Sequence, residues 1–282
     1  MRPLSSYAEN SYSQFGEDGI LKEILTRLST SRLLTKWCVE FGAWDGVFLS
    51  NTCRLIREDG FRAVLIEGDP KRVSELESNF PGDEVTKLCA FVGLTGATTL
   101  DSILKKTAIP HDFDVLSVDI DGCDYHVWES LDQYRPKVVI IEYNPTMPNS
   151  VEYVQPADLS VFHGSSPKSL CNLACTKGYG LVAVTSTNLF FVADEHVDLV
   201  TGSNVLSLNE LRDDHQCEVF LFSGHDGTLL LSQDLILPYH NVRIPAKRMQ
   251  IVPKPIRRWP SNKSLAQKLV TAWFRFRHDS AT

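Results

Sequence analysis

The sequence predicts an α/β protein built on a mostly parallel sheet. Short apolar segments alternate with helix-like segments of about ten residues, an order typical of βαβ units. The apolar segments are continuous, which indicates strands covered by helices on both faces. The last two predicted strands, residues 181–186 and 188–193, leave no room for a crossover helix, so we expect them to pair antiparallel.

The elements follow one another regularly along the first two thirds of the chain. Pro70 favours a helix start at its own position, and a glycine favours the end of the helix at 167–180. Residues 217–232 predict two strands around a turn, and residues 264–277 predict an amphipathic helix. The expected strands are 36–42, 62–68, 84–93, 114–120 and 137–143, and the expected helices between and after them are 49–59, 70–80, 99–107, 124–131 and 167–180.

Composition and charge exclude several classes of protein. The chain has 282 residues, of which 43% are hydrophobic and 22% charged, as in ordinary globular proteins. Its net charge of −7 is uneven, because residues 247–282 carry nine Lys or Arg and one acid. An acidic body disfavours nucleic acid as a partner. The basic tail favours either packing on that body or on a second copy, or peripheral contact with an anionic surface.

Cysteine usage and the first residues of the chain bear on the cellular compartment. Seven cysteines, an odd number without zinc-ribbon spacing, predict reduced thiols and a cytoplasmic protein. The polar first residues lack the apolar centre of a signal peptide. We expect three segments: a core with an N-terminal cap at 1–195, an accessory element on the substrate side at 196–246, and a basic amphipathic tail at 247–282.

The first expected strand ends in a glycine turn, EFGAWDG, that indicates a ligand site. Gly42 and Gly46 permit a sharp turn and a close backbone approach. Their spacing differs from the G-x-G-x-x-G of dinucleotide binders, and Glu40 and Asp45 would repel a pyrophosphate. Glu67, at the next strand end, is placed to accept hydrogen bonds from two ribose hydroxyls. Together these residues predict S-adenosylmethionine as the ligand. The alternative is that Asp45 and Asp69 are ordinary loop acids and that Glu67 is a solvated strand end.

Acidic residues also follow the fourth and fifth expected strands. Asp119 and Asp121 alternate, so they point to one side if the chain stays extended. With Glu142 and Asn144 they form a set of oxygen ligands suited to Mg²⁺ or Mn²⁺. The alternative is a site without metal, in which Asp119 contacts the cofactor's amine or orders the loop, and Glu142 and Asn144 hydrogen-bond the acceptor. Asp124 is expected to N-cap the following helix.

A histidine completes the expected acceptor side. His163 follows the fifth strand and precedes a helix, where it can act as a base or a ligand, or be an ordinary loop histidine. The predicted catalytic residues are therefore Asp121, Glu142, Asn144 and His163.

Seven blocks of this sequence resemble, in order, the FkbM-type family of S-adenosylmethionine-dependent methyltransferases. They are YSQFGEDGIL, EFGAWDG, LSNT, LIEGDP, DIDGCDYHVW, IIEYNP and KGYGLVAVTSTNLFFV, and the resemblance covers roughly residues 10–195. It implies a Rossmann-like class I methyltransferase fold with a seven-stranded sheet, and O-methylation, often of sugars or glycans. It also implies an N-terminal segment folded over the site. The expected cofactor contacts are Gln14, Glu40, Gly42, Asp45, Asn51, Glu67 and Asp119.

The prediction is thus a methyltransferase that acts on an oxygen of a sugar or a hydroxylated small metabolite, with metal assistance and homo-oligomer formation left open. Two other classes remain as alternatives. One is a non-catalytic binding module that keeps the fold. The other is a nucleotide-cofactor oxidoreductase, against which the missing G-x-G-x-x-G argues.

Overall fold

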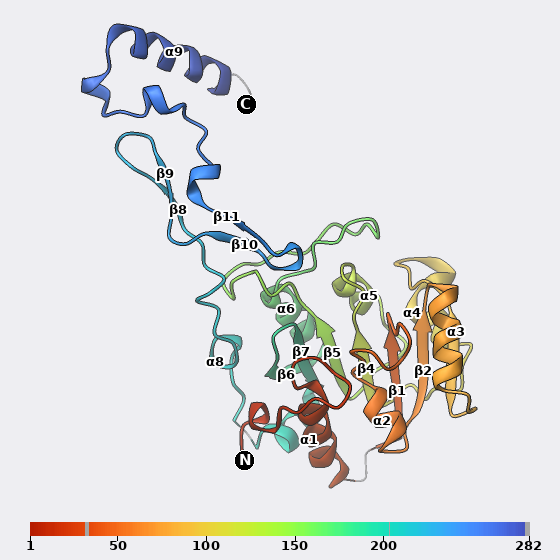
Figure 1. The fold of residues 1–282 in the computed structure, drawn as a ribbon. Coiled ribbons are helices and arrows are strands. Elements are labelled where there is room, and N and C mark those ends of the chain that lie inside the picture. The colour runs from red at the N-terminus through yellow and green to blue at the C-terminus, as the bar shows by residue number, and fades with distance from the viewer. Residues whose placement is uncertain (32–33, 203, 280–282) are drawn as a thin grey trace. The chain divides into compact units, whose positions relative to one another are not determined.

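The computed structural model describes residues 1–31, 34–202 and 204–279, in two compact units, Met1–His215 and Gln216–Thr282. The first unit holds a seven-stranded sheet in the order β3-β2-β1-β4-β5-β7-β6 (Figure 1). Strands β1 to β5 are parallel, and β7 lies antiparallel between β5 and β6. The strands are β1 (Trp37–Phe41), β2 (Arg62–Glu67), β3 (Val85–Cys89), β4 (Val115–Val118), β5 (Val138–Glu142), β6 (Tyr179–Val184) and β7 (Asn188–Ala193).

Local signals start and end the helices of this unit. Asp69 caps α3 by accepting from the Lys71 amide, and Ser166 caps α6 by accepting from the Ser169 amide. Gly178, with φ +74°, ends α6 in the left-handed region. The helices are α1 (Glu17–Ser29), α2 (Cys53–Arg57), α3 (Pro70–Asn79), α4 (Leu100–Leu104), α5 (Asp124–Glu129), α6 (Pro167–Lys177), α7 (Asp194–Thr201) and α8 (Leu208–Leu211).

Helices cover the sheet on both faces, as the continuous apolar strands predict. One apolar core joins Val39 and Phe41 of β1 to side chains of α4, α5 and α6. The other joins Cys38, on the opposite face of β1, to side chains of α1, α2 and α7. In the first core, the ring of Trp128 stacks on Phe191 with centroids 5.3 Å apart. The predicted fold class and antiparallel strand pair are confirmed.

The second unit has small elements and little core of its own. It contains the hairpin β8 (Leu221–Ser223) and β9 (Leu229–Leu231), the pair β10 (Leu235–Leu237) and β11 (Val242–Ile244), and helix α9 (Leu265–Asp279). Among its described residues, Ile256 is the one buried hydrophobic side chain. The predicted strand pair in 217–232 and the amphipathic helix are present. In the described part of the chain, no helix is both long and apolar enough for a membrane span.

The first unit continues beyond residue 195, where the sequence places the end of the core. Helices α7 and α8 were not predicted, and α7 packs against α1 and β6. Helix α1 was not predicted as a helix either, although its residues lie in the expected N-terminal cap. The accessory segment therefore begins as part of the sheet unit.

Candidate cofactor and acceptor site

The carboxyl ends of the parallel strands meet at one edge of the sheet, and the turn after β1 passes close to the end of β4. Gly42 has φ +73°, and a Cβ at this position would lie 1.9 Å from the backbone oxygen of Asp119. Both the conformation and the space therefore require glycine. The close approach joins the glycine turn to the acids that follow β4.

Glu40 lies buried beneath this turn. Its carboxylate accepts hydrogen bonds from the Ser50 hydroxyl (2.6 Å), the Asn51 amide (2.8 Å) and the Thr52 hydroxyl (2.7 Å). Burial raises the pKa of Glu40 in spite of these bonds. The Asn51 side chain in turn donates to the hydroxyl of Ser117 in β4 (3.1 Å). Glu40 and Asn51 thus anchor the segment after the turn, and their contacts with a ligand stay predictions.

Glu67, at the end of β2, connects two turns. One carboxylate oxygen accepts from the Trp44 amide (2.9 Å) and the other from the Asp69 amide (2.8 Å). The side chain is half-buried. Each oxygen keeps a lone pair, so Glu67 can also accept from two hydroxyls of a ligand.

Two aromatic residues that sequence reasoning did not single out flank Glu67. The ring of Phe91 lies over Gly68, where a Cβ would be 2.3 Å from it, and is largely exposed. Trp44 is also exposed, with the guanidinium of Arg72 3.9 Å from its ring centroid. The available signal was an aromatic residue within three positions of a strand end, since β1 ends at Phe41 and β3 at Cys89. These rings provide flat apolar surfaces beside a hydrogen-bonding carboxylate.

The N-terminal segment lies beside the same edge of the sheet. The buried carboxylate of Glu17 accepts from the Thr185 hydroxyl (2.6 Å) and the Asn188 side chain (3.4 Å). Asn188 pairs with Glu142, so this contact lies at the carboxyl end of β5. Gln14 itself is exposed, and its contact with a cofactor stays a prediction.

Asp45 shapes the loop that follows the glycine turn. Its carboxylate accepts from the amides of Val47 (2.9 Å) and Phe48 (2.7 Å). This is an ordinary turn-stabilising contact, so the expected ligand contact of Asp45 also stays a prediction.

Three of the four expected metal ligands converge. One carboxylate oxygen each from Asp119, Asp121 and Glu142 lies within 4.8 Å of the others. The path of the chain differs from the extended one assumed from the sequence, because β4 ends at Val118 and Asp121 has φ +57°. This left-handed residue turns the chain, and the carboxylates still meet across the ends of β4 and β5.

This carboxylate cluster (Asp119, Asp121 and Glu142) brings three carboxyl groups together where two of them are half-buried. Burial, followed by the neighbouring carboxylates, raises the pKa of both Asp119 and Glu142. Because like charges this close together repel each other, the pair favours binding a proton. Within residues 1–31, 34–202 and 204–279, none of the ion pairs involves these three acids. Neutralisation therefore requires bound protons or a cation.

Asp124 does not N-cap α5, which corrects the sequence prediction. It is the first residue of that helix, and the N-cap is Cys123, which makes no side-chain cap bond. Its carboxylate instead accepts from the amides of Ile120 and Gly122, both at 2.9 Å. The reason is the left-handed turn at Asp121, which directs these two amides towards the side chain. Burial raises the pKa of Asp124 to about 6. Asp124 holds the loop that carries Asp119 and Asp121.

Asn144 and His163 lie together on the loops after β5. The Asn144 side chain donates to the backbone oxygen of His163 (2.7 Å) and accepts from the Thr146 amide (2.9 Å). The exposed ring of His163 hydrogen-bonds the Tyr153 hydroxyl through Nδ1 (2.7 Å). The amide of Asn144 is thus engaged in holding the loops, and the roles of Asn144 and His163 as ligand or base stay predictions.

A buried arginine distant in sequence clasps the same loop. Arg212 donates to the backbone oxygens of Pro145 (2.7 Å) and Met147 (3.0 Å) and to the Asn149 side chain (2.6 Å). It also donates to the Tyr143 hydroxyl (3.1 Å). Sequence reasoning missed Arg212, since no local pattern links it to a loop more than sixty residues earlier.

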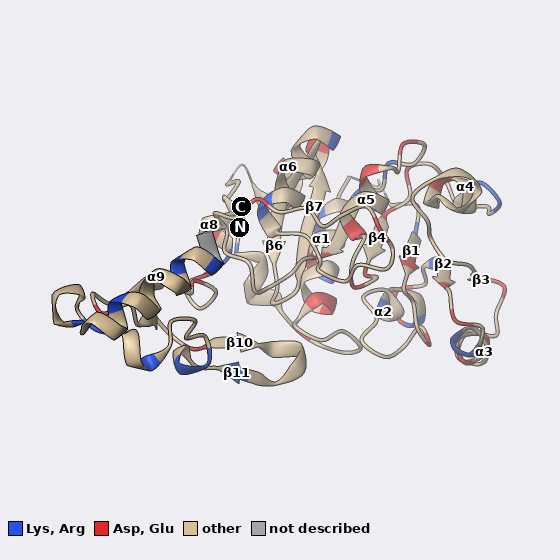
Figure 2. Ribbon diagram, turned by 90° about the horizontal axis from the view of Figure 1, so that it is seen from above, with Lys and Arg blue, Asp and Glu red and all other residues tan. Residues whose placement is uncertain are grey.

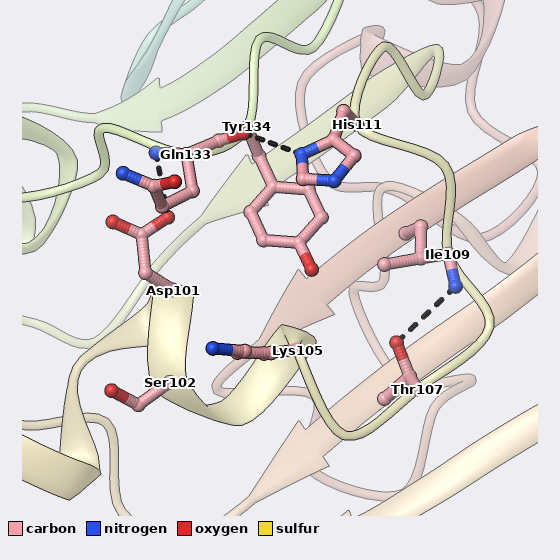
Figure 3. A pocket seen from close by; sticks show the side chains of 8 residues that line it. All are labelled: Asp101, Ser102, Lys105, Thr107, Ile109, His111, Gln133 and Tyr134. Atoms are coloured by element: carbon pink, nitrogen blue, oxygen red, sulfur yellow. Dashed lines mark hydrogen bonds between the residues drawn. The ribbon is translucent and has the colours of Figure 1, made fainter.

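A separate pocket of about 430 Å³ opens at the opposite edge of the sheet, before β4 and β5 begin. Figure 3 shows Asp101 and Ser102 of α4, and Lys105 directly after this helix, on one side of the pocket and Gln133, Tyr134 and His111 on another. The ring of His111 stacks on Tyr134 with centroids 4.8 Å apart. The lining residues are Asp101, Ser102, Lys105, Thr107, Ile109, His111, Gln133 and Tyr134, and none of them belongs to the carboxylate cluster.

The strand order, with β7 antiparallel between β5 and β6, defines the class: this is a class I methyltransferase fold. The resemblance to the FkbM type is confirmed over residues 95–165, which match the model of the methyltransferase FkbM domain. That stretch contains the whole carboxylate cluster as well as Asn144 and His163. None of the curated proteins matches the chain.

Solved structures of methyltransferases are similar to this chain at low sequence identity. An O-methyltransferase from Bacillus cereus in complex with SAH is 16% identical, covers 67% of this chain and 86% of its own, and has a TM-score of 0.41. An SAM-dependent methyltransferase from Aquifex aeolicus is 13% identical, covers 67% of this chain and 95% of its own, and has a TM-score of 0.38.

Proposed function

We propose that the protein transfers a methyl group from S-adenosylmethionine to a hydroxyl of a sugar or a hydroxylated small metabolite, assisted by Mg²⁺ or Mn²⁺. The observation that carries the proposal is the convergence of Asp119, Asp121 and Glu142 beside the glycine turn. The match to the methyltransferase FkbM domain over the same residues supports the reaction class.

The residues around the glycine turn fit the cofactor. When bound, S-adenosylmethionine supplies a methyl group already activated by its sulfonium. Glu67 has free lone pairs for the two ribose hydroxyls, and Phe91 and Trp44 offer flat surfaces for the adenine ring. Gly42 lets the turn after β1 pack against the backbone of Asp119, which brings the glycine turn next to the carboxylate cluster. The missing G-x-G-x-x-G and the acids at this edge disfavour a dinucleotide.

The carboxylate cluster fits a hard divalent cation. Mg²⁺ and Mn²⁺ prefer carboxylate oxygens, and such an ion supplies a Lewis acid that lowers the pKa of a coordinated hydroxyl. Asp121 is the exposed member of the cluster and can accept a proton from an acceptor hydroxyl. His163, exposed on the neighbouring loop, is a second proton acceptor on the same side. Asp119 and Glu142, the half-buried members, would hold the ion.

An oxygen acceptor suits this chemistry, and the acidic body disfavours nucleic acid as a partner. Asp121 and His163 can remove the proton of a hydroxyl group. The family resemblance favours sugars and glycans as the molecules that carry this hydroxyl. The proposal also places the reaction in the cytoplasm, because the odd cysteine count favours a reducing compartment.

Calorimetric titration tests the proposal directly. S-adenosylmethionine and S-adenosylhomocysteine are titrated into the purified protein with and without Mg²⁺, and roughly micromolar binding is expected. Turnover with hydroxylated acceptors should cease in chelator and return with Mg²⁺ or Mn²⁺.

Each component of the proposal can fail separately. No binding of either compound would remove the cofactor assignment. Full activity after exhaustive chelation would remove the metal alone. Cofactor binding without turnover on any hydroxylated acceptor tested would favour the non-catalytic binding module.

A further inference from the structure

Helix α9 presents an apolar stripe to solvent. Leu265, Leu269 and Trp273 follow one another at intervals of four residues, so they lie on one face of the helix. Their side chains are 77%, 66% and 57% exposed. A surface helix ordinarily turns such a stripe towards a core. The second unit offers none, because Ile256 is its one buried hydrophobic residue among those described.

The opposite, more polar face of α9 is the one that packs. Gln267, Thr271 and Phe274 are half-buried and share that face. The Gln267 side chain donates to the backbone oxygen of Pro255 (2.8 Å), and Lys263 donates to the Thr271 hydroxyl (3.2 Å). The helix is therefore docked on the preceding segment with its apolar stripe turned outwards.

Cations border the apolar stripe on both sides. On a helical projection, Lys268 and Arg275 fall on one border and Arg277 on the other. The guanidinium of Arg277 lies 5.0 Å from the ring centroid of Trp273. Figure 2 shows further Lys and Arg along the same unit, and residues 247–282 contain nine of them against a single acid, Asp279. The surface around the stripe is strongly positive.

We propose that α9 binds an anionic lipid surface, lying in the interface with Leu265, Leu269 and Trp273 inserted among the lipids. The apolar stripe supplies the buried area, and the flanking cations face the lipid headgroups. An anionic membrane satisfies both features at once, because it is negatively charged and apolar a few ångströms below its surface. The proposal is independent of the methyl acceptor and of the cofactor.

Vesicle co-sedimentation of the full-length protein tests the proposal. One set of vesicles is phosphatidylcholine alone, and the other contains phosphatidylcholine and phosphatidylserine in roughly a 3:1 ratio. The protein should sediment with the anionic vesicles and stay in the supernatant with the neutral ones. Binding should weaken with rising salt, since the headgroup attraction is screened.

Two variants separate the apolar and the electrostatic contributions. Leu269→Glu with Trp273→Glu should abolish sedimentation. Arg275→Gln with Arg277→Gln should weaken it by about fivefold per cation. Val205→Glu is the matched control, because Val205 is an exposed apolar residue of the first unit, and it should sediment like the unchanged protein. Circular dichroism verifies that each variant is folded, which is expected since all these positions are exposed.

Three results would overturn the proposal. One is equal recovery in the supernatant with and without phosphatidylserine. Another is sedimentation of the Leu269→Glu, Trp273→Glu variant at the level of the unchanged protein. The third is a dimer in analytical ultracentrifugation that this variant converts to a monomer, without vesicle binding by either form; the stripe would then be an interface between two copies.

Discussion

The two edges of the sheet both bury acidic residues, but they neutralise them differently. At the amino edge, before β4, the fully buried Asp114 pairs with Lys137 at 3.0 Å. It also accepts from the amides of Thr35, Lys36 and Trp37 at 3.1, 2.6 and 3.3 Å. At the carboxyl edge, Asp119, Asp121 and Glu142 face one another, and the described residues provide them with no ion-pair partner.

The difference separates a structural acid from a functional one. Asp114 has a cation and several donors, so its burial costs little and the pair joins β1, β4 and β5 at their starts. Asp119 and Glu142 are partly buried with like charges beside them, which no fold needs for stability. An arrangement that is unfavourable alone becomes favourable when a ligand supplies the missing charge.

Removing the cation of the amino edge should have the largest effect. Lys137→Met leaves Asp114 buried without its partner, and we expect the free energy of unfolding to fall by about 3–5 kcal/mol. Urea denaturation measures it. Lys22→Met, at an exposed position of α1, is the control and should stay within about 0.5 kcal/mol of the unchanged protein. Equal stability of the two variants would show that the buried pair contributes nothing.

Replacing a carboxyl group at the carboxyl edge should lower activity while leaving stability almost unchanged. Glu142→Gln keeps the shape of the protonated carboxyl, the form that burial and the neighbouring carboxylates favour by raising its pKa. The free energy of unfolding should therefore change by less than about 1 kcal/mol. Methyl transfer should fall about 100-fold. We expect Mg²⁺ to raise the melting temperature of the unchanged protein but not that of Glu142→Gln. Glu77→Gln, exposed on α3, is the control. Retention of activity by Glu142→Gln would remove this carboxyl from the mechanism.

Two glycines with the same backbone conformation allow the edges to be compared directly. Gly60, before β2, has φ +69° and no atom within 4 Å of an added Cβ, whereas Gly42 has φ +73° and a close contact. Gly60→Ala should cost about 1–2 kcal/mol for its conformation alone. Gly42→Ala should cost about 1–3 kcal/mol more, and only this variant should lose affinity for S-adenosylmethionine. Urea denaturation and calorimetry measure the two effects, and equal behaviour would argue against the close approach.

The smallest effect is expected from Glu40, whose pKa is raised by burial above its ordinary value of 4.5. The folded state then binds the proton more tightly than the unfolded state. This stabilisation is fully present below the ordinary pKa and is lost as the pH rises through the folded pKa. The melting temperature of Glu40→Gln should therefore equal that of the unchanged protein in acid. In alkali it should exceed that of the unchanged protein, because glutamine carries no charge to bury. A temperature difference that does not vary with pH would contradict this.

Much of this protein follows from its sequence because the signals are local. Continuous apolar runs and helix periodicity place the strands and helices, and the short link between residues 186 and 188 requires an antiparallel pair. Pro70 and Gly178 mark helix ends through their own backbone preferences. Helices α7 and α8 were missed because they are short and gain stability from packing on the sheet unit.

The site is only partly predictable. Parallel strands bring their carboxyl ends to one edge, so the sequence suffices to place Asp119, Asp121 and Glu142 there. The role of Asp124 depends on the positive φ of Asp121, which the pattern of residues does not reveal. The clasp of Arg212 on the loop after β5 and the ring of Phe91 over Gly68 arise from contacts between distant segments. Such contacts depend on how the layers pack, and only the folded chain brings them together.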